Sequence, residues 1–192
     1  MQDLLSVPLD AAQPASHLGA LTRANRIDEM EFVLPVAASD GGLTAEALGR
    51  VFAEHARRPW VRRYAERATA LGFPVLAGYL RGFIDLVARR DGRFSIIDYK
   101  SNRLGPCVSD YAPERLEAAM LEHDYVLQYH LYLVALHRHL ALRLPGYDYD
   151  QHVAGAWYLF VRGMSTSHPA GWGIVQERPP RALIEALSEL LE

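Results

Sequence analysis

Lysine and cysteine are both scarce in this sequence. Lys100 is the sole lysine among 20 basic residues, so arginine fills every other cationic position. A position that stays lysine in such a chain indicates a need for a compact ammonium group with transferable protons, although chance is the alternative. Cys107 is the only cysteine. A lone cysteine excludes an internal disulfide framework, and no paired Cys/His spacing of a zinc site accompanies it.

Long apolar runs and an excess of positive charge are also missing. No stretch approaches the roughly 20 apolar residues of a membrane span, and the N-terminus lacks the basic and apolar segments of a signal peptide. We therefore expect a soluble, cytoplasmic protein in a reducing setting. The formal net charge is -3. Charge alone thus gives no reason to expect a nucleic acid partner.

The composition favours one globular domain over residues 1–192. Half of the residues are hydrophobic, which is enough for a sizeable core. Strand-like and helix-like patterns alternate, which predicts an α/β or α+β fold with a small mixed β-sheet flanked by helices. Residues 1–25 show no steady periodicity and are expected to form a loosely structured lead-in. The expected strands are 29–34, 79–88, 94–100 and 152–162, the expected helices are 45–56, 59–71, 113–121, 125–144 and 181–191, and a loop is expected at 39–43.

The strongest local pattern is a β-hairpin. Two strand-like runs flank Asp91-Gly92, a dipeptide typical of a two-residue turn. With that turn, counting back along both strands places Asp85 opposite Asp98. Lys100 then points to the same face as Asp98, because side chains two residues apart share one face of a strand. A β-bulge would shift this pairing by one residue.

Two opposed carboxylates repel each other unless a cation lies between them. Oxygen ligands suit magnesium or manganese, which keep several waters and accept phosphate oxygens of a substrate. The pattern therefore predicts phosphodiester hydrolysis, with Lys100 orienting the attacking water or offsetting charge on the phosphate. A solvated ion pair on an ordinary hairpin is the alternative, which the apolar residues expected on the same face argue against: Phe83, Val87 and Ile96. Glycoside hydrolysis, another two-carboxylate reaction, would leave the lysine without a role.

The segments around these residues resemble the RecB branch of the PD-(D/E)XK nucleases, the nuclease domains of the beta subunits of bacterial exodeoxyribonuclease V. The resemblance runs over residues 30–35, 81–87, 98–102, 125–132 and 158–163. A D...DxK pattern alone is common. It becomes specific in combination with a Q-x-x-x-Y element, which Gln128 and Tyr132 supply on one face of a following helix.

The resemblance implies a restriction-endonuclease-like core and a Mg²⁺-dependent DNA nuclease in which Mn²⁺ can substitute. It implies these metal ligands: Asp85, Asp98 and the main-chain carbonyl of Tyr99, with Lys100 as the catalytic lysine. Supporting roles fall to Gln128, Tyr132 and Glu31, and the expected DNA contacts are Arg81 and Arg103. The alternative for Gln128 and Tyr132 is helix packing on the sheet, and for Glu31 it is an exposed strand position.

One family feature is missing. Members of this branch carry a metal-binding histidine on a helix ahead of the strand 29–34, and His17 stands too close to that strand for this role. No G-x-x-x-x-G-K-[ST] loop is present, so a helicase must reside elsewhere. The implied partners are DNA, the remainder of a RecB-type chain and the other exodeoxyribonuclease V subunits, acting in recombination and double-strand-break repair. The competing hypothesis is a nuclease-fold module without turnover, used for DNA binding or subunit docking.

Two further groups of residues are interpreted without a catalytic role. A solvated helix face is favoured over phosphate contacts for five arginines: Arg57, Arg58, Arg62, Arg63 and Arg67. Packing or surface positions are favoured for four histidines: His123, His130, His137 and His139.

Overall fold

The computed structural model describes residues 2–10, 12–37, 43–73 and 75–192, so most of the expected loop at 39–43 lies outside the described residues. The chain forms two compact units. The first comprises Met1–Met30, Ile84–His123 and Ala154–Glu177, and the second comprises Glu31–Phe83, Asp124–Val153 and Arg178–Glu192. Strands β3 (Arg26–Val36) and β4 (Gly78–Arg90) contribute residues to both units.

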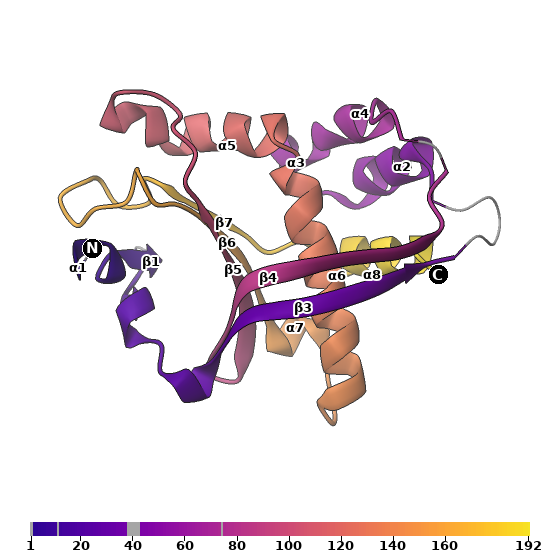
Figure 1. Cartoon of the computed structure of the whole chain (residues 1–192), viewed down its shortest axis with the longest axis horizontal. Helices are drawn as coiled ribbons and strands as arrows, with labels where there is room; N and C mark the ends of the chain where they lie inside the picture. The colour runs from indigo at the N-terminus through magenta and orange to yellow at the C-terminus, as the bar shows by residue number, and fades with distance from the viewer. Residues whose placement is uncertain (1, 11, 38–42, 74) are drawn as a thin grey trace. The chain divides into compact units, whose positions relative to one another are not determined.

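A five-stranded sheet has the order β3-β4-β5-β6-β7 (Figure 1), in which β5 is Arg93–Lys100, β6 is Val153–Phe160 and β7 is Ile174–Glu177. The pairs β4–β5 and β6–β7 are antiparallel. Strands β5 and β6 are neighbours joined through helices, the long connection that parallel strands require, and the Val161 amide bonds to the Lys100 carbonyl oxygen where both strands end. The sheet is therefore mixed, as the sequence predicts.

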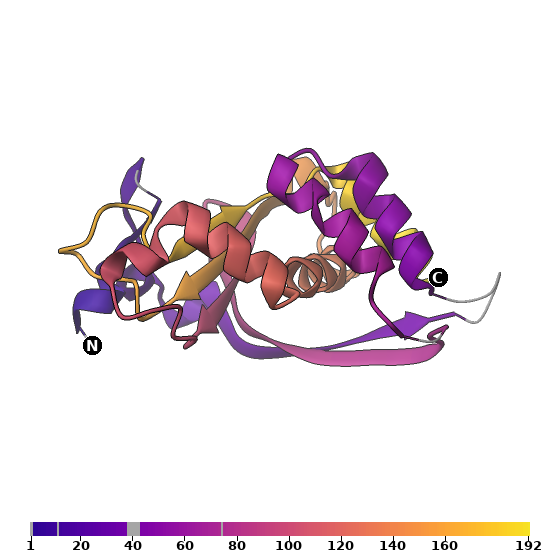
Figure 2. The same cartoon turned by 90° about the horizontal axis from the view of Figure 1, so that it is seen from above.

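The first unit packs short elements around the sheet. It contains α1 (Gln2–Leu5), β1 (Pro8–Asp10), β2 (Gln13–His17), 3-10 turns at Leu18–Ala20, Arg23–Asn25 and Val108–Tyr111, and α5 (Pro113–Glu122). Helix α5 contacts β7 (Figure 2).

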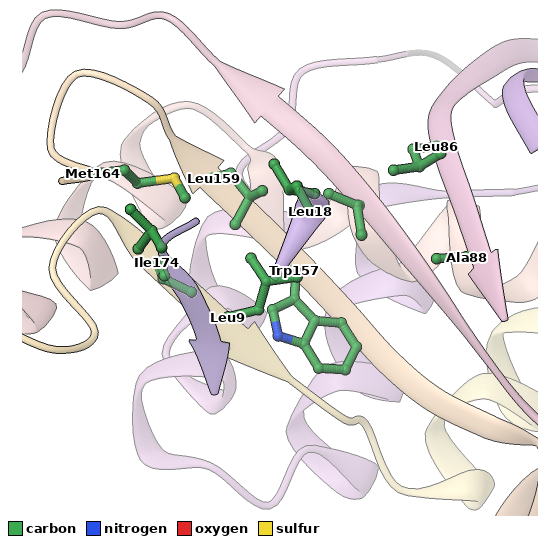
Figure 3. Packing of buried hydrophobic residues seen from close by; sticks show 10 residues of the cluster. Leu9, Leu18, Leu86, Ala88, Trp157, Leu159, Met164 and Ile174 are labelled. Atoms are coloured by element: carbon green, nitrogen blue, oxygen red, sulfur yellow. The ribbon is translucent and has the colours of Figure 1, made fainter. Parts of the chain in front are cut away.

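The expected loose lead-in is instead a small hairpin that takes part in the core. Leu9 and Leu18 pack in one cluster with Leu86, Trp157 and Leu159 (Figure 3). Strands of three and five residues are too short to show a period in the sequence, and their stability comes from this burial.

The second unit is mostly helical. Its helices are α2 (Ala45–His55), α3 (Pro59–Arg62), α4 (Tyr64–Thr69), α6 (Tyr125–Arg143), α7 (Tyr149–His152) and α8 (Arg181–Leu190). Helix α2 packs on α4 and α8, and α6 also packs on α8. The side chain of Thr44 accepts a hydrogen bond from the Ala47 amide and caps α2 as predicted. None of the described helices combines the length and apolar character needed to cross a membrane.

The predicted helix over 59–71 is two short helices. The break falls at Arg63, which keeps right-handed helical angles (φ -59°, ψ -22°). The buried residues Trp60, Tyr64 and Ala68 stay four residues apart through the break. Apolar spacing is therefore the same as in one continuous helix, and for that reason the sequence does not reveal the interruption.

Candidate active site

The β4–β5 hairpin has the predicted register. Arg90 pairs with Arg93 across the turn, and the ladder continues without a shift to Leu86 opposite Ile97. Asp85 and Asp98 are the next residues on the two strands. No bulge separates them from the turn, so the pairing argument made from the sequence holds along this stretch.

Hydrogen bonding ties the two acidic positions together. The Asp85 Oδ2 atom accepts a hydrogen bond of 2.9 Å from the main-chain amide of Tyr99, the residue after Asp98. The Asp85 side chain on β4 is thus joined to β5 at the residue that follows Asp98. Asp85 is partly exposed, whereas Asp98 is only 3% exposed.

Lys100 forms an ion pair with Asp98 in the interior of the first unit. The Lys100 Nζ atom lies 2.7 Å from Asp98 Oδ2. Lys100 is itself only 9% exposed. Val87 and Ile96 are buried nearby on the same two strands. An ordinary solvated ion pair on a hairpin surface does not fit this burial.

The electrostatics of Asp98 favour a bound cation. Burial raises the pKa of the Asp98 carboxyl, the Lys100 ammonium acts against this shift, and the negative charge of Asp85 adds to it. Burying the Asp98 carboxylate near a second carboxylate is costly without positive charge beyond that of Lys100. A divalent cation would supply that charge and would keep both acids ionised.

The number of available ligands limits which metal the site suits. Among the described residues no group of three His, Cys, Asp or Glu side chains lies close enough to hold a metal ion. Two carboxylates and a main-chain carbonyl leave several coordination positions for water and substrate. That donor set fits magnesium or manganese better than zinc in a closed site.

Tyr158 on β6 is a neighbour of Lys100 that the sequence does not single out. The Lys100 Nζ atom lies 4.9 Å from the centroid of the Tyr158 ring, and the ring is 1% exposed. A pattern of residue types cannot reveal this contact, because it depends on how β5 and β6 are aligned. Its only sequence signal is that Tyr158 begins one of the segments shared with the RecB branch.

The Q-x-x-x-Y element lies in the second unit. Gln128 Nε2 donates a hydrogen bond of 3.0 Å to the Tyr132 hydroxyl along α6. The Tyr132 ring packs edge-on against Phe32 on β3, with 5.5 Å between centroids. A Cβ atom at Gly82 would lie 2.6 Å from the Phe32 ring, so any side chain at this position of β4 would displace the ring. Three of the segments that carry the family resemblance therefore meet around one ring.

Two other candidates in the second unit bind each other. Arg81 Nε lies 2.6 Å from Glu31 Oε1, in an ion pair between exposed side chains of β3 and β4. Arg81 is thus partly neutralised, and Glu31 is an exposed strand residue, which was the alternative reading for it. Arg103 is exposed in the loop after β5 in the first unit.

Three of the histidines interpreted as packing or surface residues lie in the interior or on the surface of the second unit. His130 is fully buried, His137 hydrogen-bonds to the Tyr147 hydroxyl at 2.8 Å, and His139 is exposed. Of the basic face around α3 and α4, Arg67 forms a two-pronged ion pair with Asp124. His17, excluded from a metal role by its position, lies 3.1 Å from the Leu5 carbonyl oxygen through its Nδ1 atom.

Comparison with known proteins agrees with the geometry of the hairpin. The model of the PD-(D/E)XK nuclease superfamily matches residues 2–192. The RecBCD enzyme subunit RecB of Escherichia coli (strain K12) is 38% identical over 187 residues, which cover 97% of this chain and 15% of that protein. The subunit RecB of Mycobacterium tuberculosis (strain H37Rv) is 40% identical over 202 residues, which cover 96% of this chain and 18% of that protein. The chain spans less than a fifth of the length of these relatives, and it belongs to the PD-(D/E)XK nuclease superfamily.

Proposed function

We propose that the chain is a Mg²⁺-dependent DNA nuclease domain of the exodeoxyribonuclease V type that hydrolyses phosphodiester bonds as part of a RecB-type helicase-nuclease. The observation that carries the proposal is the buried ion pair between Lys100 and Asp98, beside Asp85 on the paired strand. Membership of the nuclease superfamily supports phosphodiester hydrolysis as the chemistry of these residues. Its partners would be DNA, the rest of a RecB-type chain and the other subunits of that complex, in recombination and double-strand-break repair.

In this proposal Asp85, Asp98 and the main-chain carbonyl of Tyr99 hold the metal. Bound there, Mg²⁺ would polarise the scissile phosphate and make a nearby water more acidic. The protein's own part is to hold the acids in place before the metal arrives. The Tyr99 amide does this for Asp85 and the Lys100 ammonium does it for Asp98. The pKa of Asp98 is raised mainly by its burial and, to a lesser degree, by the negative charge of Asp85, and a bound cation would oppose both effects.

Lys100 is the proposed catalytic residue. Its ammonium stands at the carboxylates, where it can orient the attacking water and offset the charge that develops on the phosphate. An ammonium presents three donors from one small group, whereas a guanidinium is planar and bulkier. The choice of lysine at this one position of an arginine-rich chain follows from that difference.

We assign the remaining candidates to support and DNA contact. Gln128 and Tyr132 would support the site through their hydrogen bond and through the packing of Tyr132 on Phe32. Glu31 is a weaker candidate for an auxiliary acid, because Arg81 already binds it. Both arginines are exposed, but Arg81 is already paired with Glu31, so Arg103 is the stronger candidate for a phosphate contact.

Digestion of linear single-stranded and double-stranded DNA by the 192-residue chain tests the proposal. The wild type is expected to cleave only with Mg²⁺ or Mn²⁺. Lys100→Ala is expected to lose at least about 100-fold in rate, because a positioned proton donor contributes roughly that much or more. Lys100→Arg is the matched variant: it keeps the charge and should still be impaired if proton chemistry and compact geometry matter.

Metal binding is measured separately through thermal unfolding with and without Mn²⁺. A ligand that binds only the folded state raises stability by about 2.7 kcal/mol at a concentration of 100 times its Kd. Asp85→Asn should abolish this rise, and Asp91→Asn, which removes one charge at the other end of the same hairpin, should keep it. DNA binding with no cleavage under any divalent ion would leave the competing hypothesis, a nuclease-fold module without turnover.

A further inference from the structure

The ammonium of Lys100 contacts an aromatic face as well as a carboxylate. Its Nζ atom lies 2.7 Å from Asp98 Oδ2 and 4.9 Å from the centroid of the Tyr158 ring. An ammonium over an aromatic face is attracted by the ring quadrupole, and most strongly where water is excluded. We propose that Tyr158 is a positioning residue whose ring holds the Lys100 ammonium in place for phosphodiester hydrolysis. This inference rests on the proposed function of Lys100.

The two contacts of Lys100 differ in what they do when a metal binds. Asp98 is also a proposed metal ligand, so a divalent cation would compete with Lys100 for the same carboxylate charge. The Tyr158 ring has no ligand atom facing the ammonium and would keep its attraction for it. A ring face also attracts the whole charge without fixing the direction of individual N–H bonds. The ring contact by itself therefore occupies none of the N–H donors of Lys100.

The fold fixes the ring beside the ammonium from two sides. On one side the Val161 amide donates a hydrogen bond of 3.0 Å to the Lys100 carbonyl oxygen, which ties the end of β5 to the end of β6. On the other side Tyr158 pairs with Val175 on β7. The ring is therefore held by main-chain pairing and does not have to be ordered when Lys100 becomes engaged.

The strand also offers a matched control. Trp157 precedes Tyr158 on β6, and adjacent residues of a strand face opposite sides of the sheet. Its ring packs in the cluster with Leu9 and Leu159. Trp157→Leu therefore also removes a buried aromatic ring from β6, but on the face of the sheet opposite to the Lys100 ammonium.

The single lysine makes a direct test possible. In protein with isotope-labelled lysine, Lys100 supplies the only lysine side-chain signals in an NMR spectrum. The protons next to its Nζ atom should be shifted upfield by the Tyr158 ring, in metal-free protein and after Mg²⁺ is added. The shift should persist in Tyr158→Phe and Trp157→Leu and should disappear in Tyr158→Leu. An unshifted Lys100 signal in the wild type would overturn the proposal, even if Tyr158→Leu does not fold.

Kinetics on DNA complete the test. Tyr158→Leu should lower kcat about 3- to 30-fold, which corresponds to the energy range of a cation–π contact. KM should change little, because Tyr158 is only 1% exposed and its buried ring offers no surface to the substrate. Tyr158→Phe should restore kcat, and Trp157→Leu should retain it. Unchanged kcat in folded Tyr158→Leu overturns the positioning role alone, whereas a wild type that never cleaves overturns the proposed function and this role with it.

Discussion

His130 is a buried aromatic residue of helix α6 in the second unit. It is fully buried and stacks on Tyr129 at 4.2 Å, and its ring meets Phe52 edge-on at 4.9 Å. Its Nδ1 atom lies 2.7 Å from the Val126 carbonyl oxygen. A carbonyl oxygen only accepts hydrogen bonds, so the proton of the neutral ring resides on Nδ1. Burial lowers the pKa of His130 to about 3, and the bond to Val126 opposes that shift.

Acid should therefore destabilise the protein through His130. Its pKa is about 3 when folded and 6.5 ordinarily. The contribution of the neutral ring to the free energy of unfolding is complete above pH 6.5 and is lost as the pH falls toward 3. The free energy of unfolding should fall by up to about 1.4 kcal/mol per pH unit in this range. His130→Phe keeps an aromatic ring and removes this dependence. Denaturant unfolding between pH 7.5 and pH 4.5 measures it, with the exposed His139→Gln as control. The prediction is contradicted if the free energy of unfolding depends on pH equally in the wild type and in His130→Phe.

The hairpin is the element on which the candidate site depends. Its turn places Asp91 at φ 50° and Gly92 at φ 77°. Residues with side chains other than Asn and Asp rarely adopt such angles, and asparagine and aspartate tolerate them at single positions. The turn chemistry of two residues therefore sets the register that brings Asp85 and Asp98 to neighbouring positions.

Replacement of Gly92 by alanine should weaken the hairpin through backbone strain alone. No atom lies within 4 Å of an added Cβ at this position, so the substitution meets no steric clash. We expect a loss of about 1 kcal/mol in the free energy of unfolding, the usual cost of a left-handed alanine. Gly72→Ala is the control, because Gly72 has the same open space and no positive φ. The prediction fails if denaturant unfolding gives the two variants equal stability.

Sequence patterns predict those elements whose signal is local. Asp91-Gly92 gives the turn, Thr44 gives the start of α2, and the interval of four residues puts Gln128 beside Tyr132. Contacts between distant segments are not predicted. The β1–β2 hairpin and β7 are too short for a periodic signal, and the ring of Tyr158 reaches Lys100 only after β5 and β6 align. The two acids and the lysine were accessible from sequence because all three lie on one hairpin.

At the scale of the whole molecule, net charge would govern how tightly the proposed nuclease domain binds DNA. The net charge is -3, and the chain spans 15% to 18% of the RecB proteins it resembles. Phosphate binding depends on local cations that release counterions from the strand. A negatively charged chain should therefore bind DNA weakly by itself. Its affinity should also fall only gently as salt is raised.

Arg103 should contribute to this salt dependence. Binding can be measured with Mg²⁺ in the Lys100→Ala variant, in which cleavage is expected to be slow. Each phosphate contact to single-stranded DNA contributes about -0.7 to the slope of the logarithm of the DNA association constant against the logarithm of the salt concentration. Arg103→Gln should make the slope shallower by about that amount, because its guanidinium is exposed in the loop directly after β5. Arg143→Gln removes another exposed arginine, at the end of α6, and should leave the slope unchanged. Equal effects of the two substitutions would mean that overall charge, and not a contact at the site, governs DNA binding.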